Sequence, residues 1–122
     1  MKVYLAGGMK GTWQDDLMRL VPSHTYFDPR SHGIQDPVGY TDWDLKHIGM
    51  CDVLVAYMDP SNPSGFGLSL EIGFAAALCK YIVFIDQLGL DWRSRYFGMH
   101  RVIATCVVPS VESAADALWA GE

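Results

Sequence analysis

Two carboxylates in this sequence, Glu71 and Asp44, are placed where they could do chemistry. Glu71 stands in the apolar segment GFGLSLEIGFAAAL and is the only charged side chain between Asp59 and Lys80. A carboxylate inside an apolar helix loses hydration, which is tolerated mainly where the group is paired or has a chemical task. An isolated Glu in a helix usually lies on a solvated face, but this segment offers no other charge to form one. Glu71 is therefore the first candidate for a catalytic residue.

A pair of carboxylates near a Gly-rich turn favours glycosyl transfer or hydrolysis over redox or phosphoryl chemistry. A glycosidic carbon reacts through an oxocarbenium-like transition state, which one carboxylate stabilises and traps covalently while a second acid protonates the leaving group. We expect Glu71 to be the nucleophile and Asp44 the proton donor. A helix N-terminus lowers the pKa of a carboxyl and desolvation raises it, and the sequence leaves this balance open for Glu71. Such chemistry needs no metal, and we expect no cofactor.

These residues must be positioned by strands that alternate with helices. Apolar and β-branched segments predict strands at residues 2–6, 24–28, 51–59, 81–86 and 104–108. Helices are predicted from Thr12 to Pro22, from Thr41 to Met50, over the Glu71 segment with Ser64 as a candidate cap, and within 108–121, opened by Ser110 or Ser113. Residues 87–101 are expected to be irregular. The alternation predicts an α/β fold, a flavodoxin-like (Rossmann-like) five-stranded parallel sheet with helices on both faces.

In such sheets the ligand lies over the C-terminal strand ends, where the strand order reverses. This rule gathers residues 7–12, 28–32 and 59–67 and the start of the Glu71 helix around one crevice. The turn GGMKG is either a plain tight turn or an anion site, and Lys10 favours the anion. Arg30 and His32, in a long loop, are either solvated or within reach of a phosphate, hydroxyl or base. The substrate-binding candidates here are Gly7, Gly8, Lys10, Trp13, Arg30, Ser64, Gly65 and Gly67.

The composition limits the partners of the protein. Its 122 residues, half of them apolar, fit a single domain spanning 1–122. The net charge of -5 gives no basic footprint for a nucleic-acid polymer or an anionic membrane. The three cysteines suggest neither a disulfide framework nor a zinc site, and no apolar run is long enough to span a membrane. We expect a soluble, cytoplasmic protein that acts on small molecules.

Three segments carry a family resemblance: VYLAGGMKG at 3–11, DWDLKHIGMCDVLVAYM at 42–58 and GFGLSLEIGFAAALCKYIVF at 65–84. They resemble the nucleoside 2-deoxyribosyltransferases and their 2'-deoxynucleoside 5'-monophosphate N-glycosidase relatives. The resemblance implies cleavage of the N-glycosidic bond, with transfer of the sugar to another nucleobase or to water. It implies that Glu71 forms a deoxyribosyl-enzyme, that Asp44 is a proton donor contacting the base, and that Tyr4 orients the nucleophile.

The same resemblance implies a homo-oligomer with shared active sites, in which the segment 96–100, with Met99 and His100, completes a neighbour's pocket. It also bears on the substrate. Transferases acting on free nucleosides tend to carry an Asp shortly before the Gly-rich turn, and the monophosphate-cleaving relatives have Ser there. This chain has PSGFG, with Ser64 one place out of the simplest register and no Asp. A carboxylate would repel a 5'-phosphate and a hydroxyl would accept it, which favours a nucleotide.

Two alternatives remain. The segment GFGLSLE also compares with the G-x-G-T-x-x-E of lysine-decarboxylase-like nucleoside monophosphate phosphoribohydrolases, but Leu68 stands where their Thr should be. The chain could instead be a non-catalytic nucleotide sensor that kept the pocket and lost turnover. The joint presence of Tyr4, Asp44 and Glu71 argues against the sensor. Release of free base from deoxynucleosides would distinguish an enzyme from a sensor.

Overall fold

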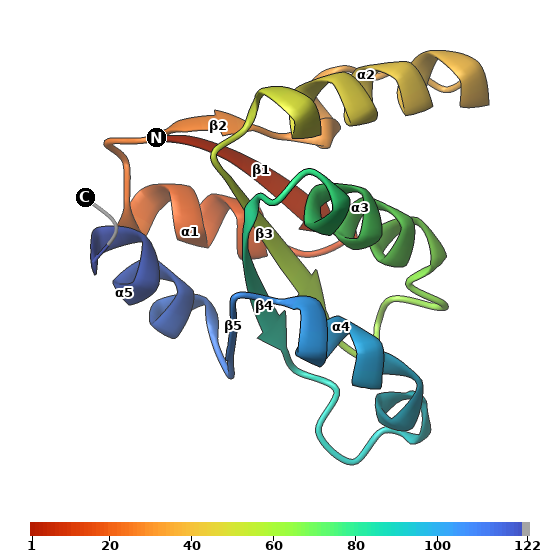
Figure 1. The fold of residues 1–122 in the computed structure, drawn as a ribbon, viewed down its shortest axis with the longest axis vertical. Helices are drawn as coiled ribbons and strands as arrows, with labels where there is room; N and C mark the ends of the chain where they lie inside the picture. The colour runs from red at the N-terminus through yellow and green to blue at the C-terminus, as the bar shows by residue number, and fades with distance from the viewer. Residues whose placement is uncertain (121–122) are drawn as a thin grey trace.

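Strands and helices alternate along the chain in a computed structural model that describes residues 1–120 (Figure 1). The strands are β1 (Lys2–Gly7), β2 (Thr25–Phe27), β3 (Val53–Met58), β4 (Tyr81–Asp86) and β5 (Cys106–Val108). The helices are α1 (Trp13–Leu20), α2 (Pro37–Met50), α3 (Phe66–Ala77), α4 (Gly98–Ile103) and α5 (Val111–Ala120), with 3-10 helices η1 (Pro29–Ser31) and η2 (Trp92–Phe97). The alternation predicted from the sequence is confirmed, and β4 has the predicted bounds.

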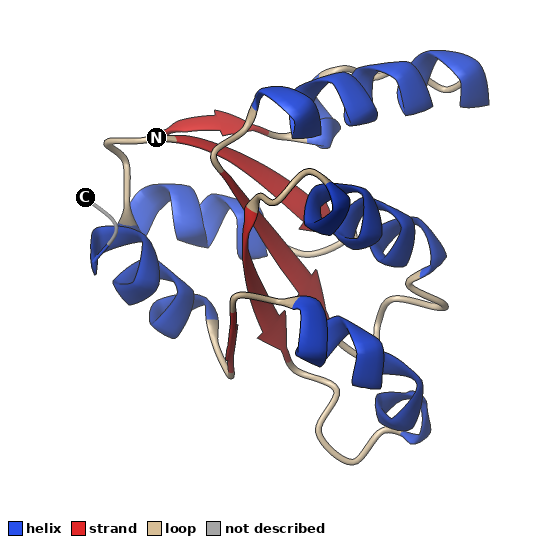
Figure 2. Ribbon diagram, in the orientation of Figure 1, coloured by secondary structure: helices blue, strands red, loops and turns tan. Residues whose placement is uncertain are grey.

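The five strands run parallel in the order β2-β1-β3-β4-β5. Helices α1 and α5 cover one face of the sheet and α2, α3 and α4 cover the other, so the fold has three layers (Figures 1 and 2). This is the flavodoxin-like arrangement that the sequence predicts. The strand order reverses between β1 and β3, where Gly7 pairs with Tyr57 at the C-terminal ends of the two strands. A ligand crevice is expected at this point.

The two faces of β1 show how the sheet builds its core. Successive side chains of a strand point to opposite faces, so Val3 and Leu5 pack under α1 and α5 while Tyr4 and Ala6 pack under α2, α3 and α4. All four are buried, as expected for a central parallel strand covered on both sides. The alternation therefore turns Tyr4 toward α3, the helix that carries Glu71.

Helix α2 begins earlier than the sequence analysis predicts, and the predicted start at Thr41 is wrong. The carboxylate of Asp36 accepts a hydrogen bond from the backbone N–H of Gly39 at 2.8 Å, and Pro37 is the first helical residue. Asp is a preferred N-cap, and Pro suits the first position because no backbone N–H is needed there. The loop after β2 is correspondingly shorter.

The segment 87–101 is not irregular, because it contains η2 and most of α4. Asp91 accepts a hydrogen bond from the backbone N–H of Arg93 at 3.0 Å and opens η2. The Arg93 guanidinium donates to the carbonyl of Pro60 at 2.7 Å and to that of Asn62. These bonds tie η2 to the loop that precedes α3. The segment is therefore ordered by polar contacts to a distant loop, and it lacks the apolar periodicity by which helices are recognised.

The helix ends agree with the sequence analysis in part. Thr12 occupies the N-cap of α1, but among the described residues its side chain caps no backbone N–H. Ser110 accepts a hydrogen bond from the N–H of Ser113 at 3.1 Å, which confirms that it opens α5. Gly121, in the last predicted helix, lies outside the described residues. Within residues 1–120, no helix combines the length and apolarity needed to cross a bilayer.

Candidate active site

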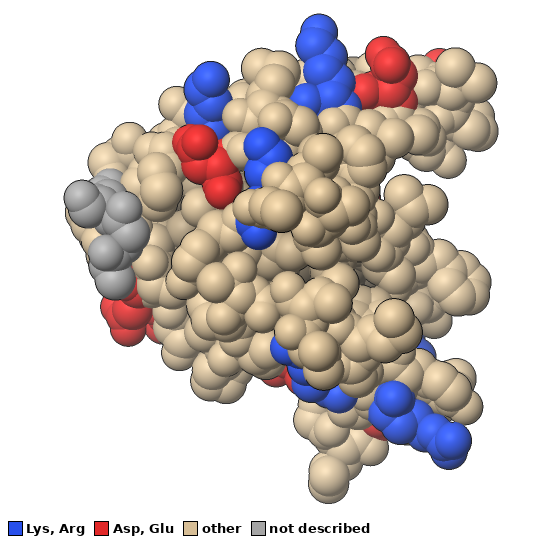
Figure 3. Space-filling model, in the orientation of Figure 1, with Lys and Arg blue, Asp and Glu red and all other residues tan. Residues whose placement is uncertain are grey.

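A cleft of about 590 Å³ opens at the C-terminal ends of β1 and β3, between α2 and α3. In the space-filling view the surface is hollowed between these two helices (Figure 3). The lining comes from the turn after β1, the loop before α2, the first half of α2 and the start of α3. The predicted site residues in this lining are Gly7, Arg30, Asp44, Ser64, Gly65, Gly67 and Glu71.

Tyr4 lies beneath this cleft and holds Glu71. Its side chain is fully buried, and its hydroxyl donates a hydrogen bond to Oε2 of Glu71. Glu71 lies on the second turn of α3, so its side chain reaches the end of the sheet next to β1. One carboxylate oxygen is thereby engaged, and Oε1 is left for a ligand. The structure brings together the nucleophile and the orienting tyrosine that the resemblance implies.

The surroundings of Glu71 raise its pKa to about 7. Burial disfavours the charged form and is the largest cause, and the nearby charge of Asp44 acts in the same direction. The hydrogen bond from Tyr4 favours the carboxylate and partly opposes them. The balance that the sequence left open is thus decided by desolvation. Near neutral pH a substantial fraction of Glu71 is ionised and able to act as a nucleophile.

Asp44 on α2 lines the cleft together with Glu71. Burial is the main reason that its pKa is raised, while His32, Tyr4 and His47 lower it to a smaller extent. A raised pKa keeps more of this carboxyl protonated, as a general acid requires. Asp44 and Glu71 thus line one cleft, and the hydroxyl of Tyr4 holds the Glu71 carboxylate.

The start of α3 shapes the rim of the cleft. Gly65, the N-cap residue, has φ +72°, a left-handed conformation that glycine adopts without strain. The first turn of α3 contains no acidic side chain, and backbone N–H groups at the start of a helix favour an anion. Ser64 lies beside this turn, and its hydroxyl accepts a hydrogen bond from the N–H of Phe66 at 3.3 Å. The rim offers hydroxyl and amide groups where an Asp would repel a phosphate.

Arg30 also lines the cleft, but it is already paired. Its guanidinium lies 2.7 Å from Asp28 and 2.8 Å from Asp15, and both carboxylates hold its pKa above the ordinary value. The bond to Asp28 fixes the loop after β2, because the same carboxylate accepts the backbone N–H of Arg30. Arg30 thus positions the wall of the cleft.

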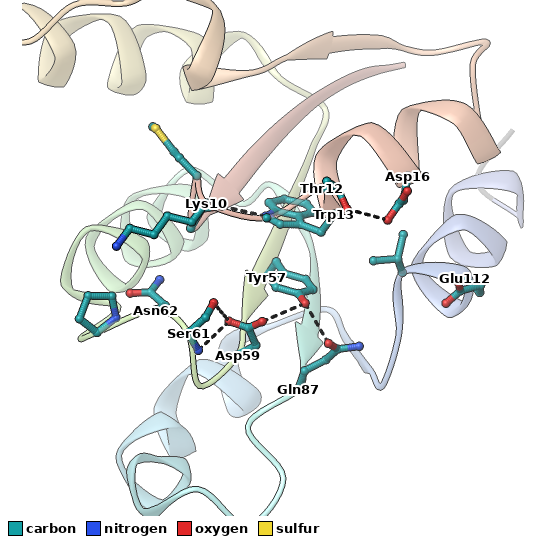
Figure 4. Close-up of a pocket in the computed structure, with 15 residues that line it drawn as sticks. Lys10, Thr12, Trp13, Asp16, Tyr57, Asp59, Ser61, Asn62, Gln87 and Glu112 are labelled. Carbon is teal, nitrogen blue, oxygen red and sulfur yellow. Dashed lines mark hydrogen bonds between the residues drawn. The ribbon is translucent and has the colours of Figure 1, made fainter.

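A second cavity, of about 440 Å³, lies on the other side of the Gly-rich turn (Figure 4). The predicted residues Gly8, Lys10 and Trp13 line it. The Trp13 ring stacks on Tyr57 with centroids 5.0 Å apart, and its Nε1 donates to the Gly8 carbonyl. Three carboxylates share this cavity with Lys10, namely Asp16, Asp59 and Glu112. This charge balance disfavours the anion that Lys10 alone suggests.

Met99 and His100 lie on α4, outside the linings of both cavities. Met99 is exposed, whereas His100 is half-buried with its Nε2 2.6 Å from the hydroxyl of Ser69 on α3. His100 thus packs α4 onto α3 within this chain. Met99 is free to contact another molecule.

Several residues of the cleft were not among the site candidates. His32, for which the sequence left a solvated and a ligand-contacting position open, contacts Asp44, and the wall near it includes Ile34, Gln35 and Tyr40. The sequence feature that could have identified these residues is the position of their loop, which follows the C-terminal end of a strand. Within residues 1–120, no group of three or more His, Cys, Asp or Glu side chains has the arrangement of a metal site.

The whole-chain similarities agree with this geometry. A 2-deoxyribosyltransferase from Bacillus psychrosaccharolyticus superposes with a TM-score of 0.74 at 18% identity, covering 94% of this chain and 90% of that one. The CMP N-glycosidase of Clostridium botulinum superposes with a TM-score of 0.66 at 21% identity, covering 97% and 98%. Identities this low show a common fold.

Sequence comparison adds the family. No curated protein is significantly similar to the chain. Residues 1–88, however, match the family described as nucleoside 2-deoxyribosyltransferase like, a span that runs from β1 through β4 and includes Tyr4, Asp44 and Glu71. The chain therefore belongs to the nucleoside 2-deoxyribosyltransferase-like family.

Proposed function

We propose that this protein cleaves the N-glycosidic bond of a 2'-deoxynucleoside or its 5'-monophosphate through a covalent deoxyribosyl ester on Glu71. The observation that carries the proposal is the half-buried Glu71 carboxylate, held by the Tyr4 hydroxyl in a cleft that it shares with Asp44. The size of the cleft, about 590 Å³, is within the range of small-molecule sites.

The reaction proceeds in two steps, each of which is a substitution at C1' of the sugar. An oxygen of Glu71 bonds to C1' as the C1'–N bond breaks, and the leaving base takes the bonding electrons together with the proton of Asp44. A second base or a water molecule then attacks C1', and Glu71 leaves as a carboxylate. The acceptor passes its proton to Asp44, which restores the acid. Transfer and hydrolysis differ only in this second step.

The rim of the cleft supports a 5'-monophosphate as the preferred substrate. Ser64 and the first turn of α3 offer a hydroxyl and backbone N–H groups, and no acidic side chain occupies that turn. A phosphate at a helix N-terminus is stabilised by these donors and by the helix dipole. Replacing Ser64 with Asp should therefore reduce monophosphate cleavage more strongly than cleavage of the free nucleoside.

An oligomer is supported by an apolar surface on α3 and α4. Phe66 and Leu70 on α3, with Met99 and Val102 on α4, are all more than 60% exposed. In Figure 3 the surface over α3, to the right of the centre, carries no charged side chain. We propose that this surface packs against another copy and brings α4 next to that copy's cleft. The variant Leu70→Glu should lower the mass measured by light scattering, and Leu90→Glu, on an exposed loop, should not.

The assay that tests the proposed function follows base release by chromatography, from deoxynucleosides and their monophosphates, with and without an acceptor base. The native enzyme should form a deoxyribosyl adduct that mass spectrometry places on Glu71. Glu71→Gln and Glu71→Ala should abolish both base release and the adduct, while Glu112→Gln, a carboxylate of the second cavity, should keep them. Near-normal turnover of Glu71→Ala would refute the mechanism. Failure of the native protein on every substrate would indicate a sensor.

A further inference from the structure

His32 is held rigidly beside the proposed acid. It follows η1 in the loop before α2, and its side chain is only 8% exposed. The ring meets Trp43 edge to face with centroids 4.7 Å apart, and Trp43 stacks on His47 with centroids 3.8 Å apart. Packing of this kind fixes the orientation of an imidazole, so both ring nitrogens have definite neighbours.

The backbone selects the tautomer of His32. The N–H of Ile34 donates a hydrogen bond to Nδ1 at 2.9 Å. A backbone N–H can only donate, so Nδ1 must accept and the ring proton must be on Nε2. The Nε2–H of His32 is thus a donor whose direction is fixed by the ring orientation.

The Nε2 of His32 faces Oδ1 of Asp44 at 3.3 Å. Both atoms are sealed from solvent and have no other hydrogen-bond partner among the described residues, and at 3.3 Å their mutual contact is close without the alignment of a full hydrogen bond. The Asp44 side chain as a whole is nevertheless 20% exposed to solvent. Because Oδ1 is sealed, the part of the carboxyl that a ligand can reach is Oδ2. The two oxygens of Asp44 therefore have different surroundings.

We propose that His32 is a positioning residue that directs its Nε2–H to Oδ1 of Asp44 and so places the transferable proton on Oδ2, the oxygen facing the substrate. This inference rests on the proposed function only in its kinetic consequence. A carboxyl that accepts a hydrogen bond at one oxygen holds its own proton on the other. The leaving base then meets the proton in one orientation, and no rotation of the carboxyl is needed before transfer.

Two substitutions of His32 separate the roles of its nitrogens. His32→Gln can place an amide N–H near the position of Nε2, which keeps the donor to Asp44 but loses the bond to Ile34. His32→Asn places an oxygen near Nδ1, which keeps the bond to Ile34 but removes the donor. If His32 only stabilised the loop, Asn would be the milder change. Under the proposal Gln is the milder change for catalysis, so the two variants are matched controls for each other.

The first measurement is independent of activity. Carboxyl ¹³C NMR follows the titration of Asp44, which is faced by Tyr4 of β1, His47 of α2, Glu71 of α3 and His32 itself. His32→Asn should raise the pKa of Asp44, because a donor to the carboxylate is lost, and His32→Gln should leave it near the native value. Imidazole ¹⁵N shifts should show the proton on Nε2 of His32. A proton on Nδ1, or an unchanged Asp44 titration in His32→Asn, would overturn the proposal.

The second measurement is the pH profile of base release. His32→Asn should lower kcat by on the order of 10- to 100-fold, the effect of losing one hydrogen bond to a charged group, with KM little changed. The basic limb of the pH profile of His32→Asn should move to higher pH, because Asp44 must be protonated to act and its pKa is higher in this variant. His32→Gln should retain most of the native rate. Equal losses in both variants with no displaced limb would contradict the proposal, whereas a native protein without turnover would contradict only the proposed function.

Discussion

The hydroxyl of Tyr4 on β1 donates its hydrogen bond to Glu71 on α3, a residue 67 positions further along the chain. Tyr4 is fully buried between two pairing strands, so the hydroxyl has the rigidity of the sheet. The carboxylate consequently has one oxygen engaged by Tyr4 and one oxygen left for a ligand in the cleft. Strand β1, an interior strand of the sheet, thus orients the proposed nucleophile.

Removing this hydroxyl should change the pH dependence of catalysis. The bond from Tyr4 lowers the pKa of Glu71, so Tyr4→Phe should raise that pKa above its native value of about 7. Because the nucleophile must be ionised, the acid limb of the kcat/KM profile should move to higher pH. We expect a loss in rate of roughly 10- to 100-fold. Tyr57→Phe, which removes a hydroxyl from the second cavity, is the control. An acid limb that stays in place would argue against the role of Tyr4.

Glu71 should also make the fold less stable as the pH rises. Its pKa is raised from 4.5 to about 7 in the folded state, so between these values the folded protein holds a proton that the unfolded chain has released. Stability therefore falls from about pH 4.5 and levels off above pH 7, by up to about 3 kcal/mol. Urea unfolding of Glu71→Gln should give a larger free energy than the native protein at pH 8 and a similar one near pH 4.5. A free energy of unfolding for Glu71→Gln below that of the native protein at pH 8 would contradict this expectation.

The fold was predictable from the sequence because buried parallel strands are continuous apolar segments. The segment 81–86 became β4 with its predicted bounds for that reason. The start of α2 was missed because Thr41 also fits an N-cap, whereas the earlier start depends on the Asp36 cap and on Pro37 as the first helical residue. The segment 87–101 was missed because Arg93 binds the carbonyls of another loop, and no local pattern records such a contact.

The part of the site that could be predicted from the sequence is the part where a residue type does not fit its neighbours, such as a charged side chain in an apolar helix. Glu71 stood out as a charge in an apolar helix, and its burial and raised pKa account for that conflict. Lys10 was assigned to the same crevice, yet it lies on the other side of the Gly-rich turn, because the two faces of the sheet diverge there. The contact of His32 with Asp44 depends on loop geometry, which residue spacing alone does not specify.

The C-terminal end of α3 offers a test of the fold that is separate from catalysis. Cys79 has φ 58°, and the N–H of Lys80 bonds the Ala75 carbonyl at 3.0 Å, the pattern of a Schellman motif. Glycine adopts this conformation without a Cβ penalty, so Cys79→Gly should stabilise the protein by about 1 kcal/mol. Cys79→Ala keeps the penalty and should give no gain. Thermal unfolding measures both, and a lower Tm for Cys79→Gly would contradict the expectation.

Two glycines at the other end of α3 should respond oppositely to the same change. A Cβ added at Gly65 would lie 2.8 Å from the Phe97 ring and 3.1 Å from the sulfur of Met58, at φ +72°. Strain and overpacking together should destabilise Gly65→Ala by about 3 kcal/mol. A Cβ at Gly67 meets no atom within 4 Å, so Gly67→Ala should be as stable as the native protein or slightly more stable.

Their effects on the reaction should differ as well. Gly67 lines the cleft, so its added methyl group occupies open space that the substrate would use, and KM should rise while kcat changes little. Gly65→Ala displaces the first turn of α3 and with it Glu71, so kcat should fall even at temperatures where the protein remains folded. Steady-state kinetics alongside thermal unfolding separates the two. A Gly67→Ala variant with an unchanged KM for every substrate would show that the start of α3 does not contact the ligand.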